Sequence, residues 1–508
     1  MKPLLTLLVT FLILVPVCRA DVIANSYDWR DVYTVAIYSH YRGEDFHFVN
    51  SLGEAKILSM TLNKSKGHVI FESSSNSVVK NLQNFLNLRG FEKISSENFG
   101  DYKDLQFTLF GKLNNLKGFV VINDEFGYDA ISVAPYALTH DYWVLFYNPD
   151  TKKRVIDLLN SHPDLPVIFY GEFLDRPWKK VKNTYNIIDE KNFFKNNMAI
   201  LSLYVKESSV SNPWLIVTSG TYLDEGYILE KMPIAFTKEN VEELINFLKA
   251  SGINTVEIIG PESVNYGQLI REKSNRTIGV VARIGRTFTG ASELRGKSFV
   301  LRTIPVDVPE LNLKVENVYF DTINKILILN ITNKGNIDTY YYLNGMGLFY
   351  GRREIFPEFN TSMHVLPKHY SFSLPIKLNV SQPPERIELL GLYGYEFPLE
   401  NYFDSKPYNV TPIELRDNSD LKIVSVWYDA TSEKFKISLK NLGSAPVWAY
   451  GEITNFYLMG LNRTFFFKGI EIKPQETKEL SLDVHLEEED LKANKDLKVT
   501  IYYGKDKD

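Results

Sequence analysis

The histidines are the first candidates for chemistry in this chain, because imidazole serves both as a general base and as a zinc ligand. His364 and His369 flank an expected turn and could hold a metal ion there, although solvated loop histidines are the simpler interpretation. No two histidines have the His-Glu-x-x-His spacing that places two zinc ligands on one helix face. The sequence therefore predicts no metal site and no cofactor. The eight histidines are His40, His47, His68, His140, His162, His364, His369 and His485.

Serine and carboxylate residues also lack a recognisable catalytic pattern. Ser77 and Lys80 match the Ser-x-x-Lys spacing, but no Lys-Thr-Gly element accompanies them. A Gly-x-Ser-x-Gly elbow, a Walker A loop and a dinucleotide-binding fingerprint are absent from the sequence. Adjacent acids such as Asp124-Glu125 do not define an acid–base pair, because the separation of the carboxylates in space decides that chemistry. We expect a protein that is not an enzyme.

Two loops are the best candidates for contact with a ligand or a partner. Residues 123–129 follow the expected strand Phe119–Ile122, and residues 217–224 follow the expected strand Trp214–Val217. Parallel sheets place their ligand sites at the carboxyl ends of strands. The alternative is that both loops are Gly-containing turns that only join a strand to a helix. The candidate residues are Asp124, Tyr128, Asp129, Ser219, Thr221, Tyr222 and Asp224.

Strands that alternate with helices must position these loops, and the pattern extends over residues 28–300. Several apolar runs suit strands that are covered on both faces. Three segments, which begin at His68, Trp143 and Pro233, align as strand, polar turn, amphipathic helix and strand. This pattern predicts three α/β repeats with parallel sheets, over residues 28–115, 116–195 and 196–303. The expected strands are Thr34–Tyr38, His68–Phe71, Phe119–Ile122, Val144–Tyr147, Val167–Tyr170, Trp214–Val217, Ile234–Phe236, Val256–Ile259 and Thr277–Val281.

The chain changes character after an expected linker at Ile304–Pro309, which contains two prolines. Beyond it, apolar and polar residues alternate as in half-buried strands. LKVENVYFDTINKILILNITNKGNIDTYYY, from Leu313, aligns without a gap with LKIVSVWYDATSEKFKISLKNLGSAPVWAY, from Leu421. The duplication predicts two all-β, immunoglobulin-like sandwiches over residues 311–412 and 420–506. A single large β domain is the alternative.

The first twenty residues indicate export. Lys2 precedes an apolar run from Leu4 to Val17, and Ala20 offers a small residue at a cleavage point. This is the pattern of a Sec signal peptide over residues 1–20, with an uncleaved anchor as the alternative. Cys18 is the only cysteine, so cleavage after Ala20 would exclude disulfides and thiolate zinc sites from the mature protein. We expect an extracellular, cell-surface protein without a C-terminal anchor.

The overall composition is that of a globular protein, with 44% hydrophobic and 23% charged residues. The net charge of −5 gives no basic footprint for a nucleic acid, so we expect no nucleic-acid partner. The cysteine-poor, Lys-, Glu- and Tyr-rich style is typical of a thermophilic archaeal protein. Asn-x-Ser/Thr sequons fit an exported glycoprotein. They occur at Asn63, Asn275, Asn330, Asn360, Asn379, Asn409 and Asn462.

The α/β repeats over about residues 30–300 resemble the cell-wall-binding repeat 2 family of exported, surface-layer-type proteins. Family modules run from a strand through an Asp-Ala pair to a helix of small residues, then to a Pro-Ile-Leu-Leu strand, and end in Ile-Gly-Gly. The segments that carry the resemblance are Phe119–Asn123, Phe126–Ala137, Trp143–Tyr147, Pro233–Thr237, Ile258–Glu262 and Arg283–Arg286. This sequence departs from the family pattern at Gly171-Glu172 and Gly260-Pro261, where the family has Gly-Gly. The resemblance implies three α/β modules that bind a cell-envelope polymer.

Three functions remain open at this point. In the first, the protein is a non-catalytic cell-envelope or surface-layer-associated protein that binds an envelope glycan or a protein partner through its α/β repeats. In this case it could also be a non-covalently held subunit of a membrane complex. In the second, it is a secreted hydrolase of polysaccharide or peptide with β-sandwich accessory modules. In the third, it is an extracellular solute-binding receptor. We favour the first, because repeats distribute binding and no concentrated set of reactive residues is visible.

Overall fold

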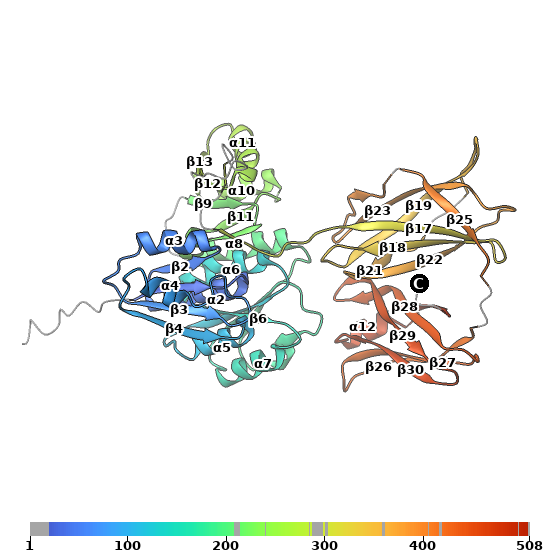
Figure 1. Cartoon of the computed structure of the whole chain (residues 1–508), viewed down its shortest axis with the longest axis horizontal. Coiled ribbons are helices and arrows are strands. Elements are labelled where there is room, and N and C mark those ends of the chain that lie inside the picture. Colours follow the sequence, from blue (N-terminus) through green and yellow to red (C-terminus); the bar gives the residue numbers. More distant parts are fainter. Residues whose placement is uncertain are drawn as a thin grey trace, which may run out of the picture. The chain divides into compact units, whose positions relative to one another are not determined.

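The computed structural model divides into two compact units (Figure 1). The first comprises residues up to Phe173 together with Pro177–Val308, and the second comprises Leu174–Arg176 together with Pro309–Asp508. The expected signal peptide lies outside the described residues, apart from Ala20. None of the described helices combines the length and the apolarity that crossing a membrane requires. The structure describes residues 20–207, 214–238, 240–283, 285–286, 298–299, 303–357, 361–404, 406–415, 419–495 and 497–505.

The first unit contains three four-stranded parallel sheets that share one strand order. When the four strands of a sheet are counted in chain order, the first lies between the second and the third, and the fourth lies at the edge next to the third. Figure 1 shows helices packed beside these sheets. A parallel pair needs a long crossover connection, which explains why helices alternate with strands along the sequence. The N-terminal part is therefore an α/β unit with parallel sheets, as the sequence predicts.

The elements of the three sheets are as follows. The first sheet has the order β2-β1-β3-β4, from β1 (Asp21–Asn25), β2 (Phe46–Val49), β3 (His68–Ser73) and β4 (Ile94–Phe99), with helices α2 (Trp29–Arg42), α3 (Leu52–Thr61), α4 (Leu82–Asn87) and α5 (Tyr102–Phe110). The second has the order β6-β5-β7-β8, from β5 (Gly118–Asn123), β6 (Tyr142–Tyr147), β7 (Val167–Tyr170) and β8 (Tyr185–Ile188), with α6 (Gly127–His140), α7 (Lys152–Ser161), η1 (Pro177–Lys180) and α8 (Phe193–Glu207). The third has the order β11-β9-β12-β13, from β9 (Trp214–Thr218), β11 (Ile234–Phe236), β12 (Thr255–Ile259) and β13 (Gly279–Arg283), with α9 (Glu225–Leu229), α10 (Val241–Ala250), η2 (Pro261–Ser263) and α11 (Val264–Lys273). Two short pairs complete the unit, β10 (Tyr222–Asp224) with β16 (Thr303–Pro305) and β14 (Gly285–Arg286) with β15 (Ser298–Phe299).

The beginning of the first sheet differs from the sequence prediction. Residues Thr34–Tyr38, expected as a strand, lie inside helix α2. This helix is buried over ten of its fourteen residues, so its apolar run has no helical periodicity to distinguish it from a strand. The real first strand is β1, whose five residues are all buried and which begins directly after the expected cleavage point. The last expected strand, Thr277–Val281, is observed as β13 at Gly279–Arg283.

The internal alignment is also out of step in the first repeat. The segments from Trp143 and Pro233 run from the second to the third strand of their sheets, through α7 and α10. The segment from His68 runs instead from the third strand, β3, to the fourth, β4. Its true counterpart is the stretch from β2 through α3 to β3, which begins at Phe46. The error arises because two consecutive units, β2–α3–β3 and β3–α4–β4, have the same strand–helix–strand pattern in the sequence.

Among its described residues, the second unit is all-β apart from α12 (Glu488–Ala493), and the strand pairs described there are antiparallel except for β17 with β25. Its larger sheet has the order β20-β19-β23-β25-β17-β18-β22, and two smaller sheets have the orders β26-β27-β30 and β29-β28-β31. The large sheet consists of β17 (Leu313–Asp321), β18 (Ile326–Asn333), β19 (Thr339–Tyr350), β20 (Arg353–Ile355), β22 (Ser371–Lys377), β23 (Arg386–Gly394) and β25 (Tyr408–Ile413), with β21 (His364–Leu366) on β19 and β24 (Asn401–Tyr402) on β23. The smaller sheets consist of β26 (Leu421–Asp429), β27 (Lys434–Asn441), β28 (Val447–Leu458), β29 (Leu461–Ile472), β30 (Thr477–Asp483) and β31 (Lys498–Gly504).

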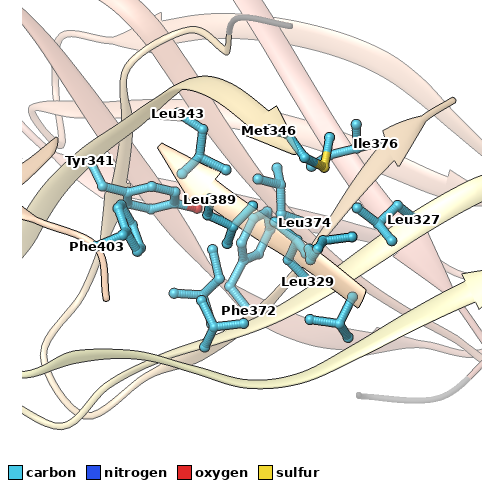
Figure 2. Packing of buried hydrophobic residues seen from close by; sticks show 14 of the residues in the cluster. Leu327, Leu329, Tyr341, Leu343, Met346, Phe372, Leu374, Ile376, Leu389 and Phe403 are labelled. Carbon is cyan, nitrogen blue, oxygen red and sulfur yellow. The ribbon is translucent and has the colours of Figure 1, made fainter. Parts of the chain in front are cut away.

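The strands β17, β18 and β22 of the large sheet pack against its strands β19 and β23, and we call this part the first sandwich. Alternate residues of these strands form its core (Figure 2). Leu327 and Leu329 of β18, Phe372 of β22 and Leu343 of β19 are buried in one cluster. A separate buried cluster fills the second sandwich, between β27, β28, β29 and β30. The period of two in burial along β18 explains why this part of the sequence alternates apolar and polar residues.

The sequence duplication corresponds to a structural duplication. Leu313 pairs with Asn333 between β17 and β18, and Leu421 pairs with Asn441 between β26 and β27. The Asn333 amide nitrogen donates to the carbonyls of Ile337 and Leu366 at 2.8 and 2.9 Å. The Asn441 amide nitrogen donates in the same way to the carbonyls of Ala445 and Ile472 at 2.8 and 3.0 Å. Each buried asparagine therefore ties the turn after its strand to a neighbouring strand.

His364 departs from the expectation of a solvated loop histidine. It lies in β21, is 4% exposed, and its Nδ1 atom is 2.8 Å from Oε1 of buried Glu452 in β28. The Tyr341 ring stacks on its imidazole at 5.3 Å. His369 is exposed, as expected, and has a backbone φ of 58°. The His364–Glu452 pair therefore links the two sandwiches of the second unit.

Candidate functional site

The carboxyl ends of β1, β4, β5 and β6 bring charged and hydrogen-bonding side chains together in the α/β unit. Asp28 follows β1 and caps helix α2, because its side chain accepts a hydrogen bond from the Arg30 backbone N–H at 2.9 Å. The Arg30 guanidinium returns to the same carboxylate, with Nε 2.8 Å from Oδ1 of Asp28. Its Nη1 atom donates to the backbone carbonyl of Asp124 at 3.0 Å. Arg30 thus connects the end of the first sheet to the end of the second.

Asp124, after β5, is the centre of this group. Its Oδ2 atom accepts hydrogen bonds from the Tyr102 hydroxyl and, at 2.5 Å, from the Asn148 side-chain amide. Tyr102 begins α5 after β4, and Asn148 follows β6. Burial, followed by the hydrogen bond to Asp124, raises the pKa of the Tyr102 phenol above its usual range. Tyr102 is therefore a protonated donor that holds the Asp124 carboxylate in place.

Asp307 closes the group from the end of the α/β unit. Its Oδ2 atom accepts a hydrogen bond from the Trp29 indole at 3.1 Å and lies 3.6 Å from Nη2 of Arg30. The Arg30 guanidinium also lies 4.9 Å from the centroid of the Tyr102 ring, within cation–π range. We call these side chains the strand-end network. They are Asp28, Arg30, Tyr102, Asp124, Asn148 and Asp307.

The expected linker is not a free connection. Thr303–Pro305 forms β16 and pairs antiparallel with β10, the strand of the second candidate loop. The Val306 N–H donates to the Thr221 carbonyl at 3.1 Å, and the Gly127 N–H donates to the Asp307 carbonyl at 2.9 Å. The Asn50 side chain after β2 donates to the Thr303 carbonyl at 3.0 Å. Residues 303–307 therefore contact the strand-end loops of all three sheets.

This segment also depends on one glycine of helix α6. A Cβ added to Gly127 would lie only 2.4 Å from Cβ of Val306, so no larger residue fits without displacement. Val306 itself is buried. Gly127 therefore permits the close approach of residues 303–307 to the first turn of α6.

The candidate residues of the first loop have different positions. Asp124 belongs to the strand-end network, as described above. Tyr128 is buried, with its ring 5.2 Å from that of Phe236 and 5.5 Å from that of Phe194. Asp129 is buried too, and desolvation, followed by the charges of Asp189 and Glu125, raises its pKa well above the usual range. The side chains of Tyr128 and Asp129 are therefore largely shielded from solvent.

The second candidate loop is mostly occupied by contacts within the unit. The hydroxyls of Ser219 and Thr221 are 2.7 Å apart, and the Ser219 hydroxyl donates to Glu262 Oε1 at 3.0 Å. Asp224 is buried and caps α9 by accepting a hydrogen bond from the Gly226 N–H at 2.8 Å. Tyr222 is exposed on β10. Of the two predicted loops, only the first therefore contributes a residue, Asp124, to the strand-end network.

Sequence reasoning missed Asp28, Arg30, Tyr102, Asn148 and Asp307. Asn148 follows an expected strand directly, so the rule that selected Asp124 could have selected it as well. Arg30 was overlooked because β1 was not recognised as a strand. Asp307 was assigned to a linker, and no local signal places it beside Trp29. Trp29 and Asp307 are 278 residues apart in the sequence, so their contact could not be predicted from it.

The strand-end network offers groups for polar recognition. It presents carboxylates, an amide and a guanidinium, which together donate and accept hydrogen bonds as a hydroxyl-rich ligand requires, while the buried Tyr102 hydroxyl orients the Asp124 carboxylate. Asp307 keeps a 53% exposed side chain, whereas those of Asp28 and Arg30 are 13% and 21% exposed. Over the residues that the structure describes, no group of three or more acidic, histidine or cysteine side chains is arranged to hold a metal ion.

The sequons lie on both units. Five of the candidate glycosylation residues are exposed, namely Asn63, Asn275, Asn379, Asn409 and Asn462. Asn330 lies within β18, where its side-chain oxygen accepts a hydrogen bond from the Ser373 hydroxyl at 2.8 Å. Asn360 is outside the described residues. The sequons at exposed residues remain the better candidates for a glycan.

Comparison with known proteins gives distant structural likenesses only. No protein-family model matches the chain, and no curated protein matches it. The chain is similar to Cwp8 from Clostridium difficile, with a TM-score of 0.40 and 17% identity over 51% of this chain and 48% of that one. The match thus spans about half of the Cwp8 chain. A chaperone–tip adhesin complex of CFA/I fimbriae (10% identity, 35% of this chain and 90% of that one) and the CsuC–CsuE chaperone–tip adhesion subunit complex of Acinetobacter baumannii (12%, 35% and 89%) both match with TM-scores of 0.15.

Proposed function

We propose that this protein is a non-catalytic component of the cell envelope that binds an envelope glycan or a surface-layer protein through its α/β unit. The strand-end network carries this proposal. Its groups come from four strand ends in two sheets and from Asp307, and they are already oriented by mutual hydrogen bonds. A polar surface that is fixed before binding loses little conformational freedom when a ligand binds to it.

An exposed aromatic residue precedes the network in the sequence. Tyr27 directly precedes Asp28 and is 62% exposed, although its backbone N–H is fixed by the Asn76 carbonyl at 2.8 Å. An aromatic side chain of this kind supplies a large contact area at a low cost in conformational entropy. We include Tyr27 in the proposed site, because a ligand with both hydroxyl groups and an apolar face, such as a sugar ring, would use an exposed ring next to Asp28.

The proposed role of the second unit is mechanical. Its two duplicated sandwiches would be immunoglobulin-like modules that act as a spacer or a docking stalk on the cell surface. The signal-peptide pattern of residues 1–20 supports export to that location.

Binding of the purified mature chain, residues 21–508, to native envelopes and to purified envelope glycans tests the proposal. We expect Asp124→Asn and Tyr102→Phe each to weaken binding by about tenfold, the effect of losing roughly 1.4 kcal/mol. The matched controls are Asp483→Asn and Tyr185→Phe, whose side chains are exposed and remote from the network in sequence. Both controls should bind as the unmodified chain does.

Two results would contradict the proposal. Equal binding by all four variants would mean that the strand-end network does not contact the ligand. Turnover of a polysaccharide or peptide library by the purified chain would show that the protein is an enzyme. Circular dichroism of each variant checks that a loss of binding does not come from a loss of folding.

A further inference from the structure

One strand, β25, closes the side of the first sandwich. It pairs in parallel with β17, where Val318 faces Val410 and Asp321 faces Ile413. It also pairs antiparallel with β23, where Ile387 faces Tyr408. β25 thus joins the sheet that contains β17 to the sheet that contains β23. Its side chains Tyr408 and Val410 pack against the buried core.

As far as the structure describes it, the second sandwich repeats this arrangement without a counterpart of β25. β26 pairs with β27 as β17 pairs with β18, and both pairs have an irregularity at the same place, between Ile423 and Ser425 and between Val315 and Asn317. β31 pairs with β28 as β23 pairs with β19. Over the part of the chain that the structure describes, no strand pairs with the outer side of β26, and none joins β26 to β31.

Equivalent residues of β17 and β26 differ in exposure. Val315 and Val318 of β17 are 9% and 3% exposed. Their counterparts Ile423 and Val426 of β26 are 39% and 41% exposed, although they remain apolar. Unsatisfied backbone groups and apolar side chains on a sheet edge promote pairing with another chain, and proteins usually block such edges with charges or proline. No charged residue and no proline lies between Ile423 and Tyr428.

We propose that the outer edge of β26 is a docking site for an extended strand of a partner polypeptide. The strand adds in parallel to β26, as β25 adds to β17, and bridges to β31. Apolar side chains at alternate positions, which correspond to Tyr408 and Val410 of β25, cover Ile423 and Val426. Main-chain hydrogen bonds provide affinity and the alternate side chains provide specificity, as in other cases of strand addition. The partner is a different protein, since β25 of a second copy is already part of that copy's first sandwich.

An extended chain tests whether the edge accepts such a strand. A second copy of residues 395–415, which includes β25, is appended after Asp508 so that its strand can reach β26 intramolecularly. We expect hydrogen exchange of the β26 amides to slow by about tenfold or more relative to the unextended chain. In the matched control, the tyrosine and the valine that correspond to Tyr408 and Val410 are replaced by aspartate in the appended copy only. This control should leave exchange at β26 unchanged, and equal exchange in all three chains would overturn the proposal.

A substitution in β26 provides the second arm. Val426→Lys in the extended chain should abolish the added protection, because the lysine would lie against the apolar face of the incoming strand. Val281→Lys is the matched control, since Val281 is 45% exposed on β13, another edge strand. It should keep the protection. Protection that survives Val426→Lys would overturn the proposal. Sedimentation of the unextended chain as a dimer, with β26 already protected, would assign the edge to a second copy and also overturn it.

Discussion

Asp31 makes the stability of the α/β unit depend on pH. It lies in the first turn of α2, is completely buried, and accepts a hydrogen bond from the Ser26 hydroxyl at 2.6 Å. Burial raises the pKa of Asp31 from 3.8 to about 7, and the charges of Asp28 and Asp101 act in the same direction. The folded unit therefore favours the neutral carboxyl group, whereas the unfolded chain ionises it at ordinary values.

The sign of the effect follows from proton uptake. Below a pH of about 4, Asp31 is protonated in both states and its carboxyl group does not oppose folding. Between about pH 4 and pH 7 the folded state binds more protons than the unfolded state, so the free energy of unfolding falls as the pH rises. Each pKa unit corresponds to about 1.4 kcal/mol, and the shift from 3.8 to about 7 therefore amounts to roughly 4 kcal/mol, as an order of magnitude.

Asp31→Asn isolates this contribution. The amide is neutral at every pH, and its oxygen can still accept the Ser26 hydroxyl hydrogen bond. We expect the variant to be more stable than the unmodified chain by only about 1 kcal/mol near pH 4.5 and by up to about 4 kcal/mol near pH 8. Because the chain has two units, hydrogen exchange of the α2 and β1 amides is a better readout than a single thermal transition.

The control is Asp104→Asn, which removes a carboxylate from a side chain that is 66% exposed in the same unit. It should leave the difference between pH 4.5 and pH 8 unchanged. Asp129, whose pKa is also raised, remains in both chains and contributes a background of the same sign. The reasoning is refuted if Asp31→Asn has the same dependence on pH as the unmodified chain.

Three further perturbations test the packing. Asn333→Ala should destabilise the second unit by about 2–3 kcal/mol in chemical denaturation, because it leaves buried carbonyls without donors; an unchanged midpoint would contradict this. Glu452→Ala should cost about 3–5 kcal/mol in the same assay, since it leaves the buried His364 without its partner, and a cost below about 1 kcal/mol would show that the pair is dispensable. Gly127→Ala should displace Val306 and make residues 303–307 sensitive to limited proteolysis, whereas an unchanged cleavage pattern would show that the segment tolerates the methyl group.

Local patterns in the sequence determined eight of the twelve strands of the three parallel sheets and the duplication of the β region. A parallel strand such as β5 is buried along its whole length, and the apolar run Phe119–Ile122 is visible for that reason. The duplication of the β region is visible because residues such as Asn333 and Asn441 have the same role at the same turn in each copy. Such features depend on neighbours within a few residues or on a repeated unit.

Features that depend on contacts between distant parts of the chain could not be predicted from such local patterns. The run Thr34–Tyr38 is apolar because helix α2 is buried on most sides, and a short apolar run has the same pattern in a buried helix and in a buried strand. β1 was hidden because it follows directly on the expected leader. His364 looked like a loop residue, since its partner Glu452 is distant in the sequence.

The composition of the candidate site is a tertiary result. The sequence identified Asp124 as a strand-end residue, but only the folded chain brings Arg30, Tyr102 and Asp307 to it. It also places residues 303–307 over the loops that the sequence had left open to solvent. A sequence can predict that the carboxyl ends of strands meet at one edge of a parallel sheet. It cannot predict contacts between separate sheets, because these depend on packing between residues that are far apart in the chain. For the same reason, only the structure showed that the side chains buried in β17 have exposed counterparts in β26.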